Sequence, residues 1–159
     1  MEAIVAVYSD WGIGADGTQP VVIKADRKHF VELTRGRTVI VGRKTLADFP
    51  GGRPLKGRRN IVLTRRDMTI DGAEIAHSAN EAFDLCRGNG IVLGGQSVFR
   101  EMLPYVDTVY VTKISCCPPS DSYFENLDED PGWRVADSGG AMVEDGMEYE
   151  FLRYERVKP

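Results

Sequence analysis

Three short apolar runs, each ending in residues suited to an anion, most strongly constrain how this chain can fold. The runs occupy residues 39–41, 61–63 and 91–93. A strand of a parallel sheet is buried on both faces, so its sequence is continuously apolar rather than alternating. Because segments with helical patterns lie between the apolar runs, the sequence predicts an α/β domain with a mostly parallel central sheet.

The residues that follow each run are suited to a negatively charged ligand. They are Gly42, Arg43, Lys44 and Thr45 after the first run, Thr64 and Arg65 after the second, and Gly94, Gly95, Gln96 and Ser97 after the third. Glycine lets a ligand approach the backbone, and a helix that begins there directs free N–H groups at it. Ligands of such sheets bind at the carboxyl ends of the strands, so we expect a ligand with several phosphates. Arginine and hydroxyl groups together favour the 2′-phosphate of NADP; the alternative is scattered surface charge.

The other segments complete a three-layer α/β/α domain with about eight strands. The strand of the second run is expected to begin at residue 59, further strands are expected over residues 3–8, 74–76, 108–114, 133–136 and 148–154, and helices over residues 25–34, from residue 79 and after residue 95. The last two strands have no helix between them and predict an antiparallel edge, joined through Gly139, Gly140 and Gly146. Residues 9–24 form a long irregular segment, which is typical of a lid over a site.

Length, charge and cysteine content limit the class of protein. The 159 residues suffice for a single domain with its own core. The net charge of −4 argues against general affinity for nucleic acid, and no apolar run approaches the ~20 residues that span a membrane. The N-terminus lacks the pattern of a signal peptide, and the three cysteines lack metal-ligand spacing. We expect a cytoplasmic monomer with free thiols and no nucleic-acid or membrane partner.

Asp26 is the most informative carboxylate of the chain. At helical spacing it shares a face with His29, Phe30 and Leu33, in the first turn of the helix expected over residues 25–34. One interpretation is an acid that only interacts with the helix dipole. The other is a half-buried acid that accepts two N–H bonds from a nitrogen heterocycle and favours protonation of that ring.

Arg58 lies just before the strand expected over residues 59–63. Its guanidinium is either solvated or a bidentate clamp for a ligand carboxylate. Competing chemistries lack their motifs. His29 and His77 are the only histidines and have no partner ligands at metal-binding spacing. The sequence also contains no G-x-S-x-G motif, no P-loop and no G-x-G-x-x-G after the first strand, so a dinucleotide would be held differently from one in a standard Rossmann domain.

A series of short segments, in order over nearly the whole chain, carries a family resemblance. The segments are residues 4–7 (Ile-Val-Ala-Val), 12–14 (Gly-Ile-Gly), 25–26 (Ala-Asp) with Phe30, 41–45 (Val-Gly-Arg-Lys-Thr), 53–60 (Arg-Pro-Leu-Lys-Gly-Arg-Arg-Asn), 93–95 (Leu-Gly-Gly), 112–114 (Thr-Lys-Ile) and 121–124 (Asp-Ser-Tyr-Phe). This ordered set resembles the dihydrofolate reductase family. The resemblance implies that NADPH reduces 7,8-dihydrofolate, with hydride transfer to C6 and protonation at N5.

The resemblance also implies roles for individual residues toward the substrate. Asp26 would hold the 2-amino group and N3 of the pterin, with Thr112 hydrogen-bonded to the Asp26 carboxylate, and these two are the implied catalytic residues. Arg58 would bind the α-carboxylate of the glutamate tail. The residues implied to line the ring pocket are Val5, Ala6, Phe30 and Leu55.

For the cofactor, the implied roles fall mostly on the strand ends described above. Gly94 and Gly95 would let the nicotinamide and diphosphate approach the backbone, while Thr64 and Arg65 surround the 2′-phosphate. The full set implied to bind NADPH is Ala6, Ile13, Gly42, Arg43, Lys44, Thr45, Leu63, Thr64, Arg65, His77, Leu93, Gly94, Gly95, Gln96, Ser97 and Val98. Residues 9–23 would close over the nicotinamide, and no metal is implied.

Five positions depart from the family pattern. They are Val21 in place of tryptophan, Lys24 in place of proline, Gln19 in place of an apolar residue, Ser97 in place of arginine and Phe99 in place of tyrosine. These departures bear on turnover, affinity and the response to antifolates. Two alternatives stay open: an NADPH-dependent reductase of the riboflavin pathway acting on a ribosylated diaminopyrimidine, and an NADPH-binding protein without turnover. The first alternative would need neither a pterin-binding acid nor a clamp for the tail.

Overall fold

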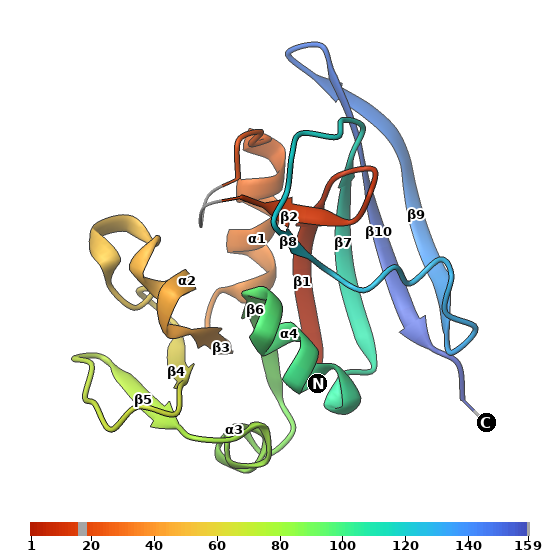
Figure 1. Ribbon diagram of the computed structural model, residues 1–159. Helices are drawn as coiled ribbons and strands as arrows, with labels where there is room; N and C mark the ends of the chain where they lie inside the picture. Colours follow the sequence, from red (N-terminus) through yellow and green to blue (C-terminus); the bar gives the residue numbers. More distant parts are fainter. Residues whose placement is uncertain (16–18, 159) are drawn as a thin grey trace.

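The central sheet of this computed structural model, which describes residues 1–15 and 19–158, is mostly parallel (Figure 1). Its strands are β1 (Glu2–Val7), β3 (Thr38–Gly42), β4 (Arg59–Leu63), β5 (Ala73–Ala76), β6 (Gly90–Gly94), β7 (Thr108–Ile114), β9 (Trp133–Glu144) and β10 (Met147–Arg156). They lie in the order β5-β4-β3-β6-β1-β7-β10-β9. All pairs from β5 to β7 are parallel, and at the C-terminal edge β10 pairs antiparallel with both β7 and β9. The predicted eight-stranded sheet with an antiparallel C-terminal edge is confirmed.

The three apolar runs form the adjacent strands β4, β3 and β6. Their central residues, among them Ile40, Ile61 and Val92, have no exposed surface. Since the three strands are parallel, their carboxyl ends lie at the same edge of the sheet, which gathers the residues that follow them.

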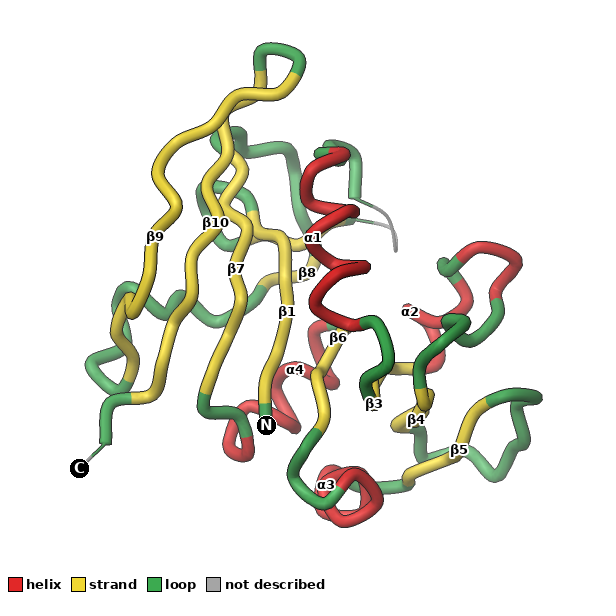
Figure 2. The backbone as a smooth tube through the Cα atoms, turned by 180° about the vertical axis from the view of Figure 1, so that it is seen from behind, coloured by secondary structure: helices red, strands yellow, loops and turns green. Residues whose placement is uncertain are grey.

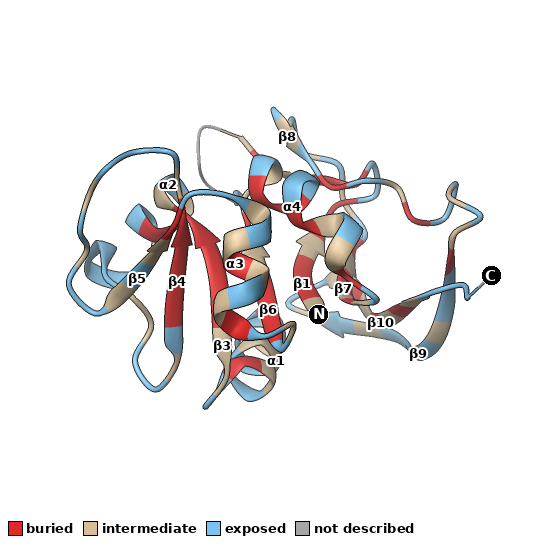
Figure 3. Cartoon of the chain, turned by 90° about the horizontal axis from the view of Figure 1, so that it is seen from below, coloured by how far each residue is buried: buried red, intermediate tan, exposed pale blue. Residues whose placement is uncertain are grey.

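Helices cover both faces of the sheet, as Figures 2 and 3 show, which confirms the three-layer architecture. They are α1 (Lys24–Thr34), α2 (Arg43–Ala47), α3 (Ala79–Cys86) and α4 (Gln96–Met102), with short 3₁₀ turns η1 (Pro50–Gly52) and η2 (Leu103–Tyr105). On one face, Ile4, Val39 and Ile91 pack against Phe30 and Leu33 of α1. On the other face, alternate residues of the same strands pack with α4, and the cluster there includes Ile40, Val92, Val98, Phe99 and Met102.

Two connections differ from the sequence-based prediction. Residues 9–24 are not irregular throughout, because β2 (Gly12–Gly14) pairs with β8 (Ser122–Tyr123), a partner about 110 residues away. Gly139 and Gly140 do not join the last two strands but lie within β9, and the turn falls at residues 145–146. The two glycines form a bulge, with φ +79° at Gly140, where the pairing of β9 with β10 shifts register.

Three further observations on the described residues concern membrane-spanning helices, metal sites and cysteines. None of the helices within residues 1–15 and 19–158 is long and apolar enough to cross a membrane. In the same residues, no three His, Cys, Asp or Glu side chains gather as a metal site would require. Cys86, Cys116 and Cys117 are all free.

Candidate active site

Asp26 lies in the first turn of α1, where it meets the middle of the sheet. The hydroxyl of Thr112, a buried residue of β7, donates a hydrogen bond of 2.6 Å to Asp26 Oδ1. The predicted hydrogen bond between Thr112 and the Asp26 carboxylate is therefore present, although the two residues are 86 positions apart in the sequence. The contact is possible because β7 is an interior strand next to β1, and α1 lies along the face of the sheet beside β1 (Figure 2).

Burial is the largest influence on the pKa of the Asp26 carboxyl group. Removal from water raises the pKa of the Asp26 carboxyl group, while the Thr112 hydrogen bond and the nearby His29 act in the opposite direction. The pKa of His29 is lowered, again mainly by burial, and its ring stacks on Phe151 with centroids 4.3 Å apart. Asp26 is thus a half-buried acid with one fixed hydrogen bond, rather than a solvated acid at a helix end.

Replacing Thr112 by valine is expected to raise the pKa of Asp26 further. The hydroxyl stabilises the ionised carboxylate, so its loss favours the protonated form. The carboxyl ¹³C signal of Asp26, followed by NMR over a pH titration, measures the change. Thr108→Val on the same strand is the control, because Thr108 lies four residues, about 13 Å, before Thr112 along β7. A midpoint that stays at the wild-type pH would contradict this role for Thr112.

Arg58 is held at the other end of α1. Its Nε and Nη2 donate hydrogen bonds of 3.2 and 3.1 Å to the hydroxyl of Thr34, and Nη1 donates to the carbonyl of Lys56. Asp26, Phe30 and Thr34 follow each other at intervals of four residues and so lie along one face of the helix. Eight residues of helix rise by about 12 Å. One side of α1 therefore carries the Asp26 carboxylate near its start and, near its end, Thr34, to which the Arg58 guanidinium is hydrogen-bonded.

Asn60, which is buried, holds the segment that carries Arg58. Its side-chain amide donates to the carbonyls of Leu55 and Arg58 at 2.9 and 3.0 Å, and its oxygen accepts from the N–H of Leu55 at 3.0 Å. This places Leu55 and Arg58 relative to the start of β4.

We expect Asn60→Ala to lower the free energy of unfolding by about 2 kcal/mol, because three hydrogen bonds of the 55–58 segment are lost together. Urea denaturation followed by circular dichroism measures the loss. The matched control is Asn89→Ala, a substitution at an exposed asparagine. Equal losses for the two variants would show that the Asn60 amide does not fix this segment.

The remaining residues predicted around the ring lie on β1, on α1 and in the loop before β4. Val5 is buried on β1, and Phe30 packs among Ile4, Leu33 and other apolar residues on the α1 face of the sheet. The carbonyl of Ala6 accepts a hydrogen bond of 3.3 Å from Nε2 of Gln19. Phe30 lies on α1, and Ala6 packs in one apolar cluster with Ala25 of α1, whereas Val5 belongs to the cluster on the α4 face of the sheet. The role of these residues and of Leu55 in binding a ring stays a prediction.

Val21, one of the five departures, is hydrogen-bonded to Tyr8, the residue after β1, a contact that the sequence did not indicate. The hydroxyl of the buried Tyr8 donates to the Val21 carbonyl at 3.3 Å and accepts from the Val21 N–H at 3.2 Å. The described part of the predicted lid, residues 9–15 and 19–23, is therefore held at Val21 as well as at Gln19. Residues 16–18 of that lid lie outside the described residues.

A pocket of about 230 Å³ lies at the carboxyl ends of the parallel strands. Its lining consists of Leu63, Thr64, Arg65, His77, Ser97, Val98 and Glu101. Six of these seven were predicted to bind a cofactor. The side chain of Arg65 is 86% exposed, with Nη2 at 3.4 Å from a carboxylate oxygen of Glu101, and Nδ1 of His77 lies 2.9 Å from the Thr64 carbonyl. Glu101 was not predicted to lie at the cofactor site. Among the described residues, it is the one acidic residue in a lining that is otherwise basic or neutral.

The glycine-rich strand ends lie close together beside this pocket. A Cβ atom built on Gly95 would lie 3.0 Å from the Thr45 hydroxyl, and one on Gly42 would lie 3.0 Å from Val98. Neither α2 nor α4 has a side chain that caps its first N–H groups. Arg43 and Lys44 occupy the first turn of α2. The predicted gathering of Gly42, Thr45, Gly95 and Val98 at one edge is thus present in the structure.

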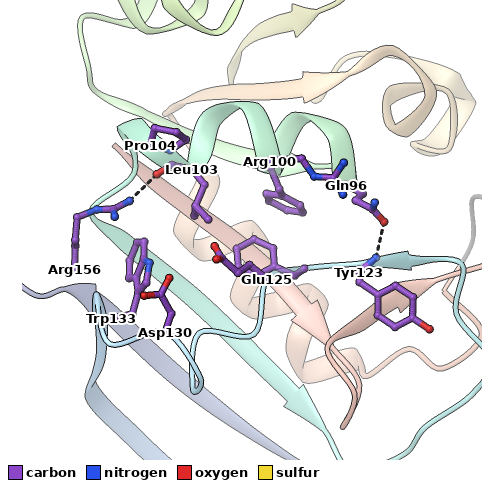
Figure 4. A pocket seen from close by; sticks show the side chains of 11 residues that line it. Gln96, Arg100, Leu103, Pro104, Tyr123, Glu125, Asp130, Trp133 and Arg156 are labelled. Carbon is purple, nitrogen blue, oxygen red and sulfur yellow. Dashed lines mark hydrogen bonds between the residues drawn. The ribbon is translucent and has the colours of Figure 1, made fainter.

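Gln96 has a different neighbour. Its Oε1 accepts a 2.7 Å hydrogen bond from the Tyr123 N–H, and both residues line a second cavity of about 740 Å³ between α4 and the segment 123–133 (Figure 4). Polar groups of that cavity are already engaged with the protein: Arg156 donates to the carbonyl of Leu103, and Asp130 accepts from the N–H of Gly132. This larger cavity is therefore a weaker candidate site than the smaller one, and neither includes Asp26.

Nearly the whole chain is similar to known proteins of one family. A family model described as dihydrofolate reductase matches residues 1–156. A dihydrofolate reductase of Staphylococcus haemolyticus is 36% identical over 159 residues, covering 98% of this chain and 95% of that protein. One of Bacillus subtilis (strain 168) is 34% identical over 158 residues, covering 96% and 92%. Among solved structures, a dihydrofolate reductase from Enterococcus faecalis complexed with NADP(H) and RAB-propyl superposes with a TM-score of 0.89 at 29% identity, covering 99% of this chain and 96% of that one.

Proposed function

This chain belongs to the dihydrofolate reductase family, and we propose that α1 holds its substrate between Asp26 at one end and Arg58 at the other. The reaction is the NADPH-dependent reduction of 7,8-dihydrofolate to tetrahydrofolate, in which C6 receives a hydride and N5 a proton. The riboflavin-pathway alternative is not favoured, because the family model and the relatives cover nearly the whole chain. The observation that carries the proposed roles is the spacing of Asp26, Phe30 and Thr34 on one helical face.

Asp26 acts by binding and by charge. Thr112 fixes the carboxylate through Oδ1, and a carboxylate oxygen can accept further N–H donors, here the 2-amino group and N3 of the pterin. A negative charge held next to the ring favours its protonated form at N5. Thr112 is a positioning residue in this scheme, because it acts on the substrate through Asp26.

At the tail, the Arg58 guanidinium has a planar donor array that suits the α-carboxylate. Thr34 accepts from its Nε and Nη2 and so orients the plane of the group. We propose that Phe30 and Leu55 contact the apolar middle of the substrate between these two charged ends.

The residues at the strand ends fit NADPH, which supplies the hydride when it is bound. The donor set of the 230 Å³ pocket combines Arg65, the Thr64 hydroxyl and His77, which suits the 2′-phosphate. The uncapped first turns of α2 and α4 offer backbone N–H groups to the remaining phosphates. At Gly94 and Gly95 a Cβ atom would lie 2.9 Å from Phe99 and 3.0 Å from the Thr45 hydroxyl, so glycine is what allows the close approach of the chain there. We propose that all the residues implied by the sequence to bind NADPH, from Ala6 to Val98, contribute to this site.

The test is a dihydrofolate-dependent loss of NADPH absorbance, with the product identified as tetrahydrofolate. We expect one NADPH to be consumed for each dihydrofolate reduced, and no oxidation with a ribosylated diaminopyrimidine. Oxidation with the pyrimidine alone would favour the riboflavin-pathway reaction. Tight NADPH binding without oxidation by either substrate would favour a protein without turnover.

We further propose that the protein acts as a monomer in the cytoplasm, without nucleic-acid partners. The residues assigned to substrate and cofactor all come from one chain, so no second copy is needed to complete the site. The free cysteines and the net charge of −4 support the compartment and the absence of nucleic acid. Sedimentation equilibrium at assay concentration tests the monomer, which a mass of twice 17.6 kDa would contradict.

A further inference from the structure

The first turn of α1 is capped by a residue from the far end of the chain. The N-cap residue, Ile23, has no side chain that could accept a hydrogen bond. Instead, the N–H groups of Lys24 and Ala25 donate to the two carboxylate oxygens of Glu144, at 2.7 and 3.0 Å. The N–H groups at a helix start need acceptors and carry partial positive charge, so an ionised carboxylate is the strongest acceptor they can find.

Glu144 is itself well placed for this contact. It is the last residue of β9, and β10 begins after a two-residue turn. Residues of the same hairpin, Met142, Met147 and Tyr149, belong to one apolar cluster with Ile23 and Ala25. The start of α1 is therefore packed against the C-terminal hairpin as well as hydrogen-bonded to it.

We propose that Glu144 is a positioning residue for Asp26, fixing the first turn of α1 so that the Asp26 carboxylate keeps its place beside Thr112. Asp26 directly follows the two residues whose N–H groups Glu144 holds. Rotation of that turn would move the carboxylate relative to β7, and a displacement of about 1 Å in a catalytic group can cost about a hundredfold in rate. This inference rests on the proposed role of Asp26 in dihydrofolate reduction.

The experiment compares Glu144→Gln and Glu144→Ala with Glu148→Gln, which removes the same charge at an exposed position of the same hairpin. The glutamine keeps one acceptor oxygen and the alanine keeps none. We expect single-turnover hydride transfer to slow about threefold in Glu144→Gln and about tenfold in Glu144→Ala, with NADPH affinity and the Glu148→Gln rate near wild type. Amide hydrogen exchange at Lys24 and Ala25, measured without ligands, is expected to accelerate in the same order.

A double-mutant cycle separates positioning from general support of the fold. If Glu144 acts through Asp26, Glu144→Ala slows hydride transfer much less in an Asp26→Asn background than in the wild type. An equal fractional loss in both backgrounds, or a Glu144→Ala rate within twofold of wild type, would overturn the inference. A wild-type protein that does not reduce dihydrofolate would instead refute the proposed function, and the exchange measurement would still report whether Glu144 caps the helix.

Discussion

Replacing Asp26 by asparagine is expected to slow hydride transfer to dihydrofolate by about a hundredfold or more at neutral pH. The substitution keeps the size of the side chain and the acceptor for Thr112, but it removes the negative charge that favours protonation at N5. The deficit is expected to shrink as the pH falls, because the substrate then arrives already protonated. Single-turnover kinetics over a range of pH measure both effects.

Stability provides the control for this variant. Burial raises the pKa of Asp26 in the folded protein, so the folded state binds the proton more tightly than the unfolded state does. Where the pH is above both pKa values, the ionised Asp26 therefore opposes folding, and Asp26→Asn is expected to unfold at a higher temperature there than the wild type. An unchanged neutral-pH rate would remove Asp26 from the mechanism, whereas a slow but more stable variant would support a role in the reaction itself.

Replacing Arg65 by alanine is expected to weaken NADPH binding by about tenfold to a hundredfold, with a much smaller effect on NADH. A hydrogen bond to a charged group contributes about 1.5–3 kcal/mol, and NADH lacks the phosphate that would receive it. The contact of Arg65 with Glu101 competes little, because an exposed ion pair contributes at most about 1 kcal/mol. Fluorescence titration with each cofactor gives the two dissociation constants.

Arg66→Ala is the matched control, because Arg66 is the exposed neighbour of Arg65 and does not line the pocket. We expect it to change both affinities by less than about twofold. If Arg65→Ala weakened NADPH and NADH equally, the phosphate in question would not be the 2′-phosphate. If Arg66→Ala matched Arg65→Ala, the effect would be one of general charge rather than of a defined contact.

Features that depend on local pattern could be predicted from the sequence. Continuous apolar runs identified β3, β4 and β6, and glycines and basic residues after them located the edge where a pocket lies. The helical spacing of Asp26 and Phe30 placed them on one face of α1. These signals work because burial on both faces of a strand, or on one face of a helix, leaves a mark within a few residues.

Contacts between distant segments could not be predicted in the same way. Glu144 caps α1 from 119 and 120 positions away, and β2 pairs with β8 across more than 100 residues. The sequence around Glu144 is typical of an exposed hairpin and does not indicate which residues the glutamate contacts. Thr34 is an intermediate case, because its spacing from Asp26 places it on the same face, but only the fold brings Arg58 to it.

Three of the departures from the family pattern take on a physical meaning in the fold. Val21 lacks an indole, yet the Tyr8 hydroxyl binds both its N–H and its carbonyl. Ser97 lies in the lining of the 230 Å³ pocket, where it is smaller and uncharged compared with arginine. The backbone N–H of Lys24 donates a hydrogen bond to Glu144, which a proline at this position could not do.

The carboxyl ¹³C signal of Asp26, recorded before and after folate is added to the protein with NADP⁺, tests the central claim most directly. If Asp26 holds the pterin ring, folate will shift this signal, and the carboxyl group will stay ionised down to a lower pH than in the free protein. A signal and a titration midpoint that folate leaves unchanged would contradict the claim.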